Sequence, residues 1–404
     1  MSSSHQAATN PSLKTAFLVQ KIGDRPPLPS QSYRLLDILE ALHEGKEVFF
    51  RYIWTVGDLM TTEIKSLTLD HKVADGLAFL EENAVRHIPI LDEEVDDKGG
   101  GSPPRRELIG IVSQRDLIRI VPPHVGTLLE GETDAKRLKE PLSVAITRNV
   151  RTAIPSTPVL EAVRVMVDQH FDCLPVVSES DDKQLVGMLT SEDVLKCFQM
   201  MEMLRKVRDV KSKAARLVDF SRGDITAPPT ELLVESMIGH ASDVMQPQVS
   251  TVMPEDSVRQ ALQLMQKNRF RHLPVLDGRG QLQGMLSDRD ILRHLPPVER
   301  DRQKANVTQK FRDELFRIDP NDPETTRSLN EKVAIVMTGS PTTVEPTTSV
   351  AEVAEVFRRG RFCAVPVATT SAEGCKVVGI VTVTDILCAF LALGRLVGSA
   401  MQHG

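Results

Sequence analysis

The sequence predicts a mixed α/β fold built from four copies of one small unit, in which a strand, a helix, two strands and a helix follow one another. One observation is a strand pattern around a proline, which occurs four times as HIPIL, CLPVV, HLPVL and AVPVA. A second is the distance from that proline back to the valine that opens the preceding helix, which is 16 residues in every copy. The four valine–proline pairs are Val73 and Pro89, Val159 and Pro175, Val258 and Pro274, and Val350 and Pro366.

Each copy begins with a short β-prone stretch, at residues 66, 151, 250 and 342, which we expect to form a first strand. The helix that follows carries apolar residues at i, i+3, i+4 and i+7, as at Val159, Ala162, Val163 and Met166 in the second copy. Asp, Ser or Thr precede this stripe in copies two to four, as helix N-cap residues do. The proline strand, a second strand opening with glycine and a last helix complete the unit.

Only the connection between the two later strands varies in length. In copy one it contains DEEVDDKGGGSPPRRE, a polar stretch rich in glycine and proline, which predicts a solvated hairpin loop. A unit of this size is too small to bury its sheet alone, so we expect the copies to pair through their sheets and share a core.

The copies are of two kinds. Copies one and three carry Arg-His before the proline and Arg-Asp in the last helix, whereas copies two and four lack both pairs. Duplication of a two-repeat module explains this alternation, and it makes copies 1+2 and 3+4 the functional units. We therefore expect repeats at 56–122, 141–200, 241–297 and 333–394, a disordered tail at 1–31, a leading helix at 32–55, a helical linker at 201–240, a charged linker at 298–332 and a tail at 395–404.

The pattern of a proline strand, then Gly, two apolar residues, Ser or Thr, two free positions and Asp resembles the CBS (cystathionine β-synthase) domain family. Two such domains form a Bateman module, and the resemblance covers roughly residues 56–200 and 241–394. It implies that adenosine-containing ligands bind between paired repeats: AMP, ADP, ATP, S-adenosylmethionine and sometimes dinucleotides.

A Ser or Thr where a strand turns into a helix lies beside free backbone N–H groups, which suit a phosphate. The Asp three residues later can accept hydrogen bonds from ribose hydroxyls. The same spacing is also that of a helix capping box, and both roles can hold at once. The four pairs are Ser113 and Asp116, Thr190 and Asp193, Ser287 and Asp290, and Thr382 and Asp385. We expect adenine to lie between first-strand residues Ile64, Val150, Val249 and Pro341 and the prolines Pro89, Pro175, Pro274 and Pro366.

Basic residues distinguish the copies further, because arginine suits contact with phosphate. Copies one and three are therefore predicted to hold phosphorylated nucleotides, and copies two and four to bind weakly or to prefer an uncharged nucleoside. The alternative is that these side chains are solvated surface charges. The candidates are Arg115 and Arg289 inside the motif, and Arg86, His87, Arg269, Arg271 and His272 before the proline strand.

Composition excludes several classes of protein. A formal net charge of −6 argues against bulk binding to nucleic acid, and the basic segment Arg205, Lys206, Arg208, Lys211 and Lys213 is interpreted as a solvated helix face. No apolar run approaches the ~18 residues of a membrane helix, and the N-terminus lacks the apolar core of a secretory signal. The five cysteines lack CxxC spacing, which argues against zinc or disulfides. No P-loop, HExxH or Ser-His-Asp grouping is present.

These observations favour a cytoplasmic, non-catalytic sensor that binds AMP, ADP or ATP, requires no cofactor and signals energy state to an unknown protein partner. A homodimer is left open. The alternatives are an interaction scaffold without ligand, a receptor for S-adenosylmethionine, NAD or cyclic di-AMP, and an enzyme with chemistry between the repeats.

Overall fold

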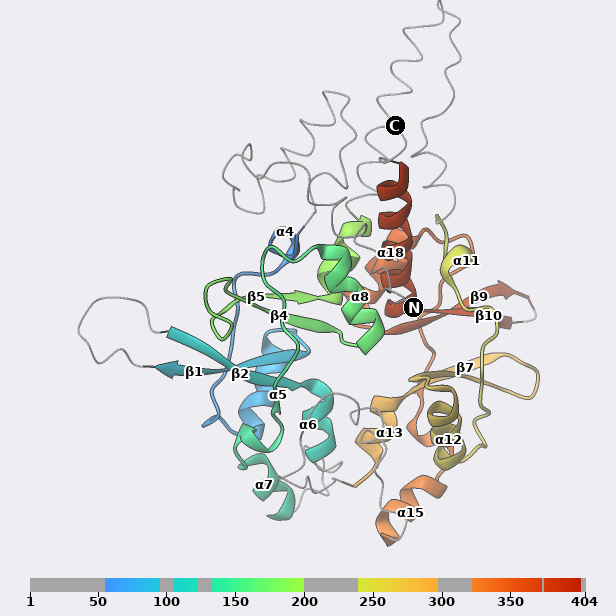
Figure 1. Ribbon diagram of the computed structural model, residues 1–404. Helices are drawn as coiled ribbons and strands as arrows, with labels where there is room; N and C mark the ends of the chain where they lie inside the picture. Colours follow the sequence, from blue (N-terminus) through green and yellow to red (C-terminus); the bar gives the residue numbers. More distant parts are fainter. Residues whose placement is uncertain are drawn as a thin grey trace, which may run out of the picture. The chain divides into compact units, whose positions relative to one another are not determined.

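The computed structural model describes residues 55–94, 105–121, 132–199, 239–296, 322–372 and 374–400. The chain divides into two units, Met1–Tyr52 and Ile53–Gly404, and every described residue belongs to the second (Figure 1). The predicted leading helix, apart from residue 55, and the basic segment around Arg205 lie outside the described residues.

The first helix of every repeat begins at the predicted valine. Ser257 and Ser349 cap two of these helices by accepting hydrogen bonds from the amides of Gln260 and Glu352, at 3.2 Å each. In copy two Pro158 occupies the N-cap position, so the expected side-chain cap does not form there. The four helices are α5 (Val73–Glu82), α8 (Val159–Gln169), α12 (Val258–Asn268) and α17 (Val350–Gly360).

The proline strand and the glycine strand of each repeat form an antiparallel hairpin with one irregularity in register. The long connection of copy one leaves the sheet at Glu94 and returns at Arg105, which pair with each other; the residues between them lie outside the description. The hairpins are β1 (His87–Glu94) with β2 (Arg105–Ser113), β4 (Cys173–Val177) with β5 (Leu185–Thr190), β6 (His272–Leu276) with β7 (Leu282–Ser287), and β9 (Ala364–Ser371) with β10 (Gly374–Thr382).

The predicted first strand is reduced to a single parallel bridge in each repeat. In copy two, for example, the amide of Ala153 donates to the carbonyl oxygen of Pro175 at 2.9 Å, and Val177 donates back to Ala153 at 2.9 Å. The other three repeats repeat this pattern at Leu67, Val252 and Val344. The carbonyl oxygen of each proline thus accepts a hydrogen bond from the first-strand segment. Proline itself has no N–H to donate in return.

Paired repeats exchange the segments that lead into them. The short strand β3 (Thr147–Arg148) precedes repeat 2 but pairs with β2 of repeat 1, and β8 (Thr338–Gly339) precedes repeat 4 but pairs with β7 of repeat 3. Conversely, Thr61 pairs with Met188 of β5, and Gln246 pairs with Ile380 of β10. This exchange confirms that repeats 1 and 2, and repeats 3 and 4, pair through their sheets.

Helices α6 and α13, which end repeats 1 and 3, and α18, which ends repeat 4, contribute contacts between the two modules; the partner of α18 is α8, the first helix of repeat 2. Helix α6 packs against α13, and α18 packs against α8 (Figure 1). The last helices are α6 (Gln114–Ile120), residues 191–199, α13 (Asp288–His294) and α18 (Val383–Ala400), which continues past the predicted end of repeat 4. Shorter helices are α4 (Val56–Leu59), α7 (Glu132–Leu138), the 3-10 turn Leu142–Val144, α11 (Ala241–Val244), α15 (Pro323–Asn330) and α16 (Val333–Val336).

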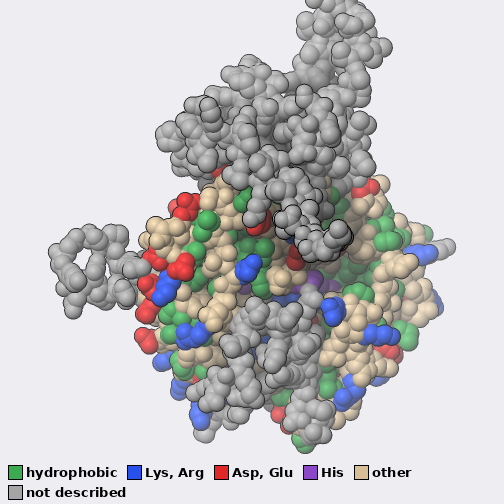
Figure 2. All heavy atoms as spheres, viewed as in Figure 1, with side chains coloured by type: hydrophobic (Ala, Val, Ile, Leu, Met, Phe, Trp, Pro, Cys, Tyr) green, Lys and Arg blue, Asp and Glu red, His purple; other side chains and the backbone are tan. Residues whose placement is uncertain are grey.

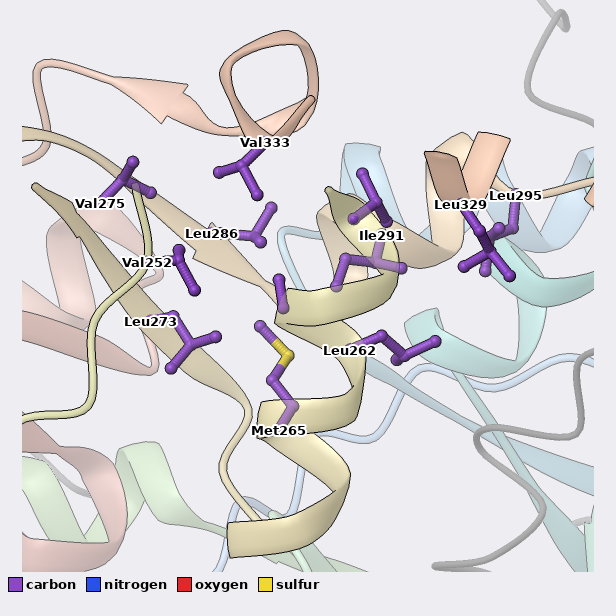
Figure 3. Packing of buried hydrophobic residues seen from close by; sticks show 12 residues of the cluster. Val252, Leu262, Met265, Leu273, Val275, Leu286, Ile291, Leu295, Leu329 and Val333 are labelled. Carbon is purple, nitrogen blue, oxygen red and sulfur yellow. The ribbon is translucent and has the colours of Figure 1, made fainter. Parts of the chain in front are cut away.

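The cores of repeats 1 and 3 include residues from the segment that leads into the next repeat. In repeat 3, Met265, Leu273 and Leu286 are buried together with Leu329 and Val333 (Figure 3). Leu329 belongs to α15, so the segment expected to be a charged linker contributes a helix to this core. The core of repeat 1 is completed in the same way by Leu142, Ala145 and Ile146.

Candidate functional site

All four Ser/Thr–Asp pairs form capping boxes. In repeat 3 the Oδ2 atom of Asp290 accepts from the Ser287 amide at 2.8 Å and from its hydroxyl at 2.6 Å, and the Asp290 amide donates back to Ser287 Oγ at 3.3 Å. The pairs in repeats 1, 2 and 4 repeat these three hydrogen bonds. One carboxylate oxygen of each Asp is thus committed to the helix start, and the other, Oδ1, faces different partners in different repeats.

Two of these Oδ1 atoms are contacted by a segment of the sister repeat, that is, the other repeat of the same module. Gln246 Nε2 donates to Asp385 Oδ1 at 2.9 Å, and Thr61 Oγ1 donates to Asp193 Oδ1 at 3.4 Å. Among the described residues, Asp290 Oδ1 has only the exposed Arg293 guanidinium as a neighbour, at 4.0 Å. Sequence reasoning missed Thr61 and Gln246, although both stand three residues before an expected adenine-pocket residue, Ile64 or Val249.

The residue three positions before the proline brings the four repeats together. This residue is Arg86, Asp172, Arg271 or Cys363 in repeats 1 to 4. Arg86 Nη1 donates to Cys363 Sγ at 3.1 Å across 277 residues of sequence. Asp172 lies close enough to Arg86 and Arg271 for them to act on its pKa.

Residues of the Ser/Thr motif extend this group across the module boundary. Arg115 Nη2 in repeat 1 lies 3.2 Å from Asp288 Oδ2 in repeat 3, and the Asp288 side chain is 2% exposed. Histidine and basic side chains gather near the middle of the face in Figure 2. We call the whole group the polar cluster; its members are Arg86, His87, Arg115, Asp172, Arg271, His272, Asp288, Arg289 and Cys363.

Burial and neighbouring charge set the protonation of the cluster. Burial, reinforced by nearby arginines, lowers the pKa of His87 and His272 to about 4, although Asp172 and Asp288 oppose this shift. Burial also acts on Arg115, but the carboxylates of Asp288 and Asp172 overcome it and raise the pKa of that guanidinium. Both histidines are therefore neutral at pH 7, while the guanidinium group of Arg115 is charged.

The cluster is left with excess positive charge and incomplete hydrogen bonding. It holds four guanidinium groups and two carboxylates. Two of its buried donor atoms, Arg115 Nε and Arg289 Nε, have no hydrogen-bond partner among the described residues; Asp288 Oδ2 forms an ion pair with Arg115 Nη2 at 3.2 Å but no hydrogen bond of good geometry. A buried network that is only partly satisfied is unfavourable, and an anion would offset the positive excess and accept hydrogen bonds from the two Nε–H groups.

The remaining predicted residues lie elsewhere. Arg269 is the exposed C-cap of α12, with a left-handed φ of 60°, so the structure does not bring it into the polar cluster. The four first-strand residues, Ile64, Val150, Val249 and Pro341, are all partly buried, and Ile64 and Val150 pack against an apolar cluster with residues from the hairpins of repeats 1 and 2. The prolines of the four strands are all buried: Pro89, Pro175, Pro274 and Pro366.

Metal-binding groups, disulfides and membrane-spanning helices are absent from the described part of the chain. It contains no group of three His, Cys, Asp or Glu side chains that could hold a metal ion. All five cysteines are free thiols. Among the described helices, none combines the length and the apolar character of a membrane span.

The chain belongs to the CBS domain family. The family model "CBS domain" matches residues 56–123, 142–199, 241–297 and 332–392, which together make up more than half of the chain. This match agrees with the four repeats and the exchanged segments described above. Mixed α/β repeats of the CBS type, paired as two Bateman modules, are thus the class of protein that fold and sequence define.

Known proteins resemble the chain over most or part of its length. Uncharacterized protein MJ1404 of Methanocaldococcus jannaschii is 24% identical over 332 residues, 82% of this chain; the match spans 61% of that relative's length. Protein MJ1225 of the same organism is 25% identical over 53% of this chain and 68% of its own, and its crystal structure gives a TM-score of 0.49 at 17% identity, covering 83% and 99%. The crystal structure of CBSX2 from Arabidopsis thaliana in complex with AMP gives 26% identity and a TM-score of 0.29, covering 39% and 98%.

Proposed function

We propose that this chain is a non-catalytic regulatory protein that binds an adenosine nucleotide, AMP, ADP or ATP, and signals the bound state to a protein partner. The observation that carries the proposal is the polar cluster, in which guanidinium groups exceed carboxylates and the buried Nε atoms of Arg115 and Arg289 lack partners. Such a group suits the phosphate of a ligand, because arginine binds phosphate through several charge-assisted hydrogen bonds. A cytoplasmic location and a homodimer stay predictions from the sequence.

The cluster also suggests how binding would be signalled. Its residues come from all four repeats, so a phosphate held there would contact both modules at once. A ligand shifts an equilibrium between two arrangements by the difference in its affinity for them. Contacts that one arrangement supplies and another lacks, such as the Arg115–Asp288 pair, provide that difference.

Repeat 3 is the preferred place for the nucleoside. Asp290 keeps more of its Oδ1 bonding capacity than Asp193 or Asp385, whose Oδ1 atoms accept hydrogen bonds from the sister repeat. Arg289, the residue before Asp290, has a buried Nε atom without a partner. Ribose hydroxyls at Asp290 and phosphate towards Arg289 would use both groups together.

The test measures binding of AMP, ADP and ATP by calorimetry and thermal unfolding. S-adenosylmethionine, NAD and cyclic di-AMP are measured in the same way as alternative ligands. We expect Arg271→Gln, inside the cluster, to weaken nucleotide binding at least tenfold. Arg269→Gln is the matched control, since it removes an exposed arginine two residues away, and should change affinity less than twofold. Equal effects of the two substitutions would contradict the proposal.

An interaction scaffold without ligand is the second candidate, and one observation favours it. All four capping boxes are closed, and Gln246 occupies Asp385 Oδ1, so each motif is already satisfied as a structural element. Protein free of co-purified nucleotide that shows no thermal stabilisation by any of the six compounds would establish this alternative in place of the sensor.

A further inference from the structure

Repeats 1 and 3 share the motif Ser-x-Arg-Asp but differ at the residue x. Repeat 3 has Asp288 at this position, and repeat 1 has the uncharged Gln114. Only Asp288 can act as a counterion, and it does so for Arg115, with 3.2 Å between Nη2 and Oδ2. Two arginines that correspond in sequence therefore stand in different electrostatic surroundings.

Of these two corresponding arginines, Arg289 is the one without a counterion among the described residues. Among the described residues no carboxylate lies within 4.0 Å of its guanidinium, and its Nε atom is buried without a hydrogen-bond partner. Arg115, by contrast, already has Asp288 as a neighbour. A ligand phosphate can bind Arg289 without displacing anything, whereas it must compete with a carboxylate for Arg115.

The charge of the cluster sets a limit on the ligand. With both histidines neutral, the four guanidinium groups and two carboxylates of the polar cluster leave an excess of about two positive charges, which the adjacent Asp116 carboxylate, acting on Arg115, reduces further. One phosphate monoester, which carries about two negative charges at neutral pH, balances that excess. The additional charges of a triphosphate would have to lie close to the Asp288 and Asp172 carboxylates.

We propose that Asp288 is a specificity-determining residue: it holds Arg115 as an internal counterion and so favours ligands with a single phosphate group, bound at Arg289, over triphosphates. This inference rests on the proposed function and adds to it a class of ligand, the nucleoside monophosphates. It also assigns unequal roles to Arg115 and Arg289, which correspond in sequence.

The experiment measures dissociation constants at fixed ionic strength and pH 7.5 for two pairs of ligands. One pair is AMP and ATP, and the other is inorganic phosphate and tripolyphosphate, which carry the same contrast in charge without adenosine. The variants are Asp288→Asn, Arg115→Gln, Arg289→Gln and the double variant Arg115→Gln/Asp288→Asn. The double variant is the matched control, because it removes the pair but leaves the net charge of the cluster unchanged.

We expect Asp288→Asn to raise the affinity for ATP relative to that for AMP by at least tenfold. The affinity for tripolyphosphate relative to that for phosphate should rise by the same factor. The double variant should return both ratios to within threefold of the wild type, and Arg115→Gln should move them in the opposite direction. Arg289→Gln should weaken the binding of AMP and of phosphate at least tenfold, whereas Arg115→Gln should weaken the binding of both less than threefold. If Asp288→Asn does not fold, as judged by circular dichroism, the Arg115→Gln and double variants decide.

Unchanged ratios in Asp288→Asn, or a larger loss of AMP and phosphate in Arg115→Gln than in Arg289→Gln, would overturn the inference. Failure of the proposed function has a different signature. In that case adenosine and AMP would show no binding beyond that of phosphate, while the phosphate and tripolyphosphate ratios would still respond to Asp288.

Discussion

At the scale of single residues, His87 and His272 are members of the polar cluster whose protonation depends on pH. Each stands two positions before the proline of its strand, and each is surrounded by arginines of its own and of neighbouring repeats. Burial lowers both pKa values from 6.5 to about 4. A neutral imidazole can lie among guanidinium groups, whereas an imidazolium there would add to the positive excess.

This difference predicts the direction of a stability change with pH. Between pH 6.5 and 4 the unfolded chain binds protons on these histidines and the folded chain does not, so the free energy of unfolding falls as pH is lowered through that window. The full contribution is present above pH 6.5, and the loss is at most about 3 kcal/mol for each histidine. Thermal unfolding at half-unit pH steps measures it, with His87→Gln/His272→Gln as the comparison. An equally steep decline in that double variant would refute the assignment.

At the scale of elements, the glycine expected to open the second strand of each hairpin lies inside that strand, and its surroundings show why a side chain is excluded there. A Cβ atom at Gly284 of β7 would lie 2.7 Å from Met337 Sδ and 2.8 Å from the Thr338 carbonyl oxygen, both in the segment leading into repeat 4. Gly110, Gly187 and Gly379 meet the corresponding lead segments in the same way. The exchange of lead segments between sister repeats therefore depends on this glycine.

Substitution at this position should uncouple the lead segment from the sheet. We expect Gly284→Ala to lower the free energy of unfolding by about 2 kcal/mol, because backbone at Thr338 must move to relieve the overlap. Gly278→Ala in the same repeat is the control, since a Cβ there meets nothing within 4 Å. Urea unfolding compares the two, and a Gly284→Ala protein as stable as Gly278→Ala would argue against this role of the glycine.

At the scale of the whole molecule, a few residues link the two modules. The rings of Phe198 in repeat 2 and Phe390 in repeat 4 pack edge to face with centroids 6.1 Å apart, and both are buried. The Arg115–Asp288 pair links repeats 1 and 3, and the Arg86–Cys363 contact links repeats 1 and 4. The apolar contact supplies stability and the polar contacts supply a response to charge.

Removal of the apolar link should weaken the association of modules. We expect Phe390→Ala to lower the free energy of unfolding by about 3–5 kcal/mol, since it leaves a cavity beneath Phe198. Phe270→Ala, which removes a ring that is 37% exposed, should have a much smaller effect. Calorimetry of both variants tests this; similar losses would show that the Phe198–Phe390 contact is not a special source of stability.

Sequence reasoning identified the repeats, the start of each first helix and the Ser/Thr–Asp pairs, because these follow from local periodicity and fixed spacing. It placed Arg86, His87, Arg271 and His272 on the phosphate side but grouped Arg269 with them. The structure separates Arg269 from this group. Arg269 lies two residues before Arg271, at the C-cap of α12, where its side chain is exposed to solvent. The capping-box alternative is realised in all four repeats.

The sequence by itself determined the four-repeat fold, since each repeat encodes its own apolar stripe, strand pair and helix start. Only the tertiary structure decided that one residue from each repeat meets in a common polar cluster, that Asp288 neutralises Arg115, and that α15 completes the core of repeat 3. These contacts join residues far apart in the chain, and no spacing along a single sequence specifies which of them become neighbours.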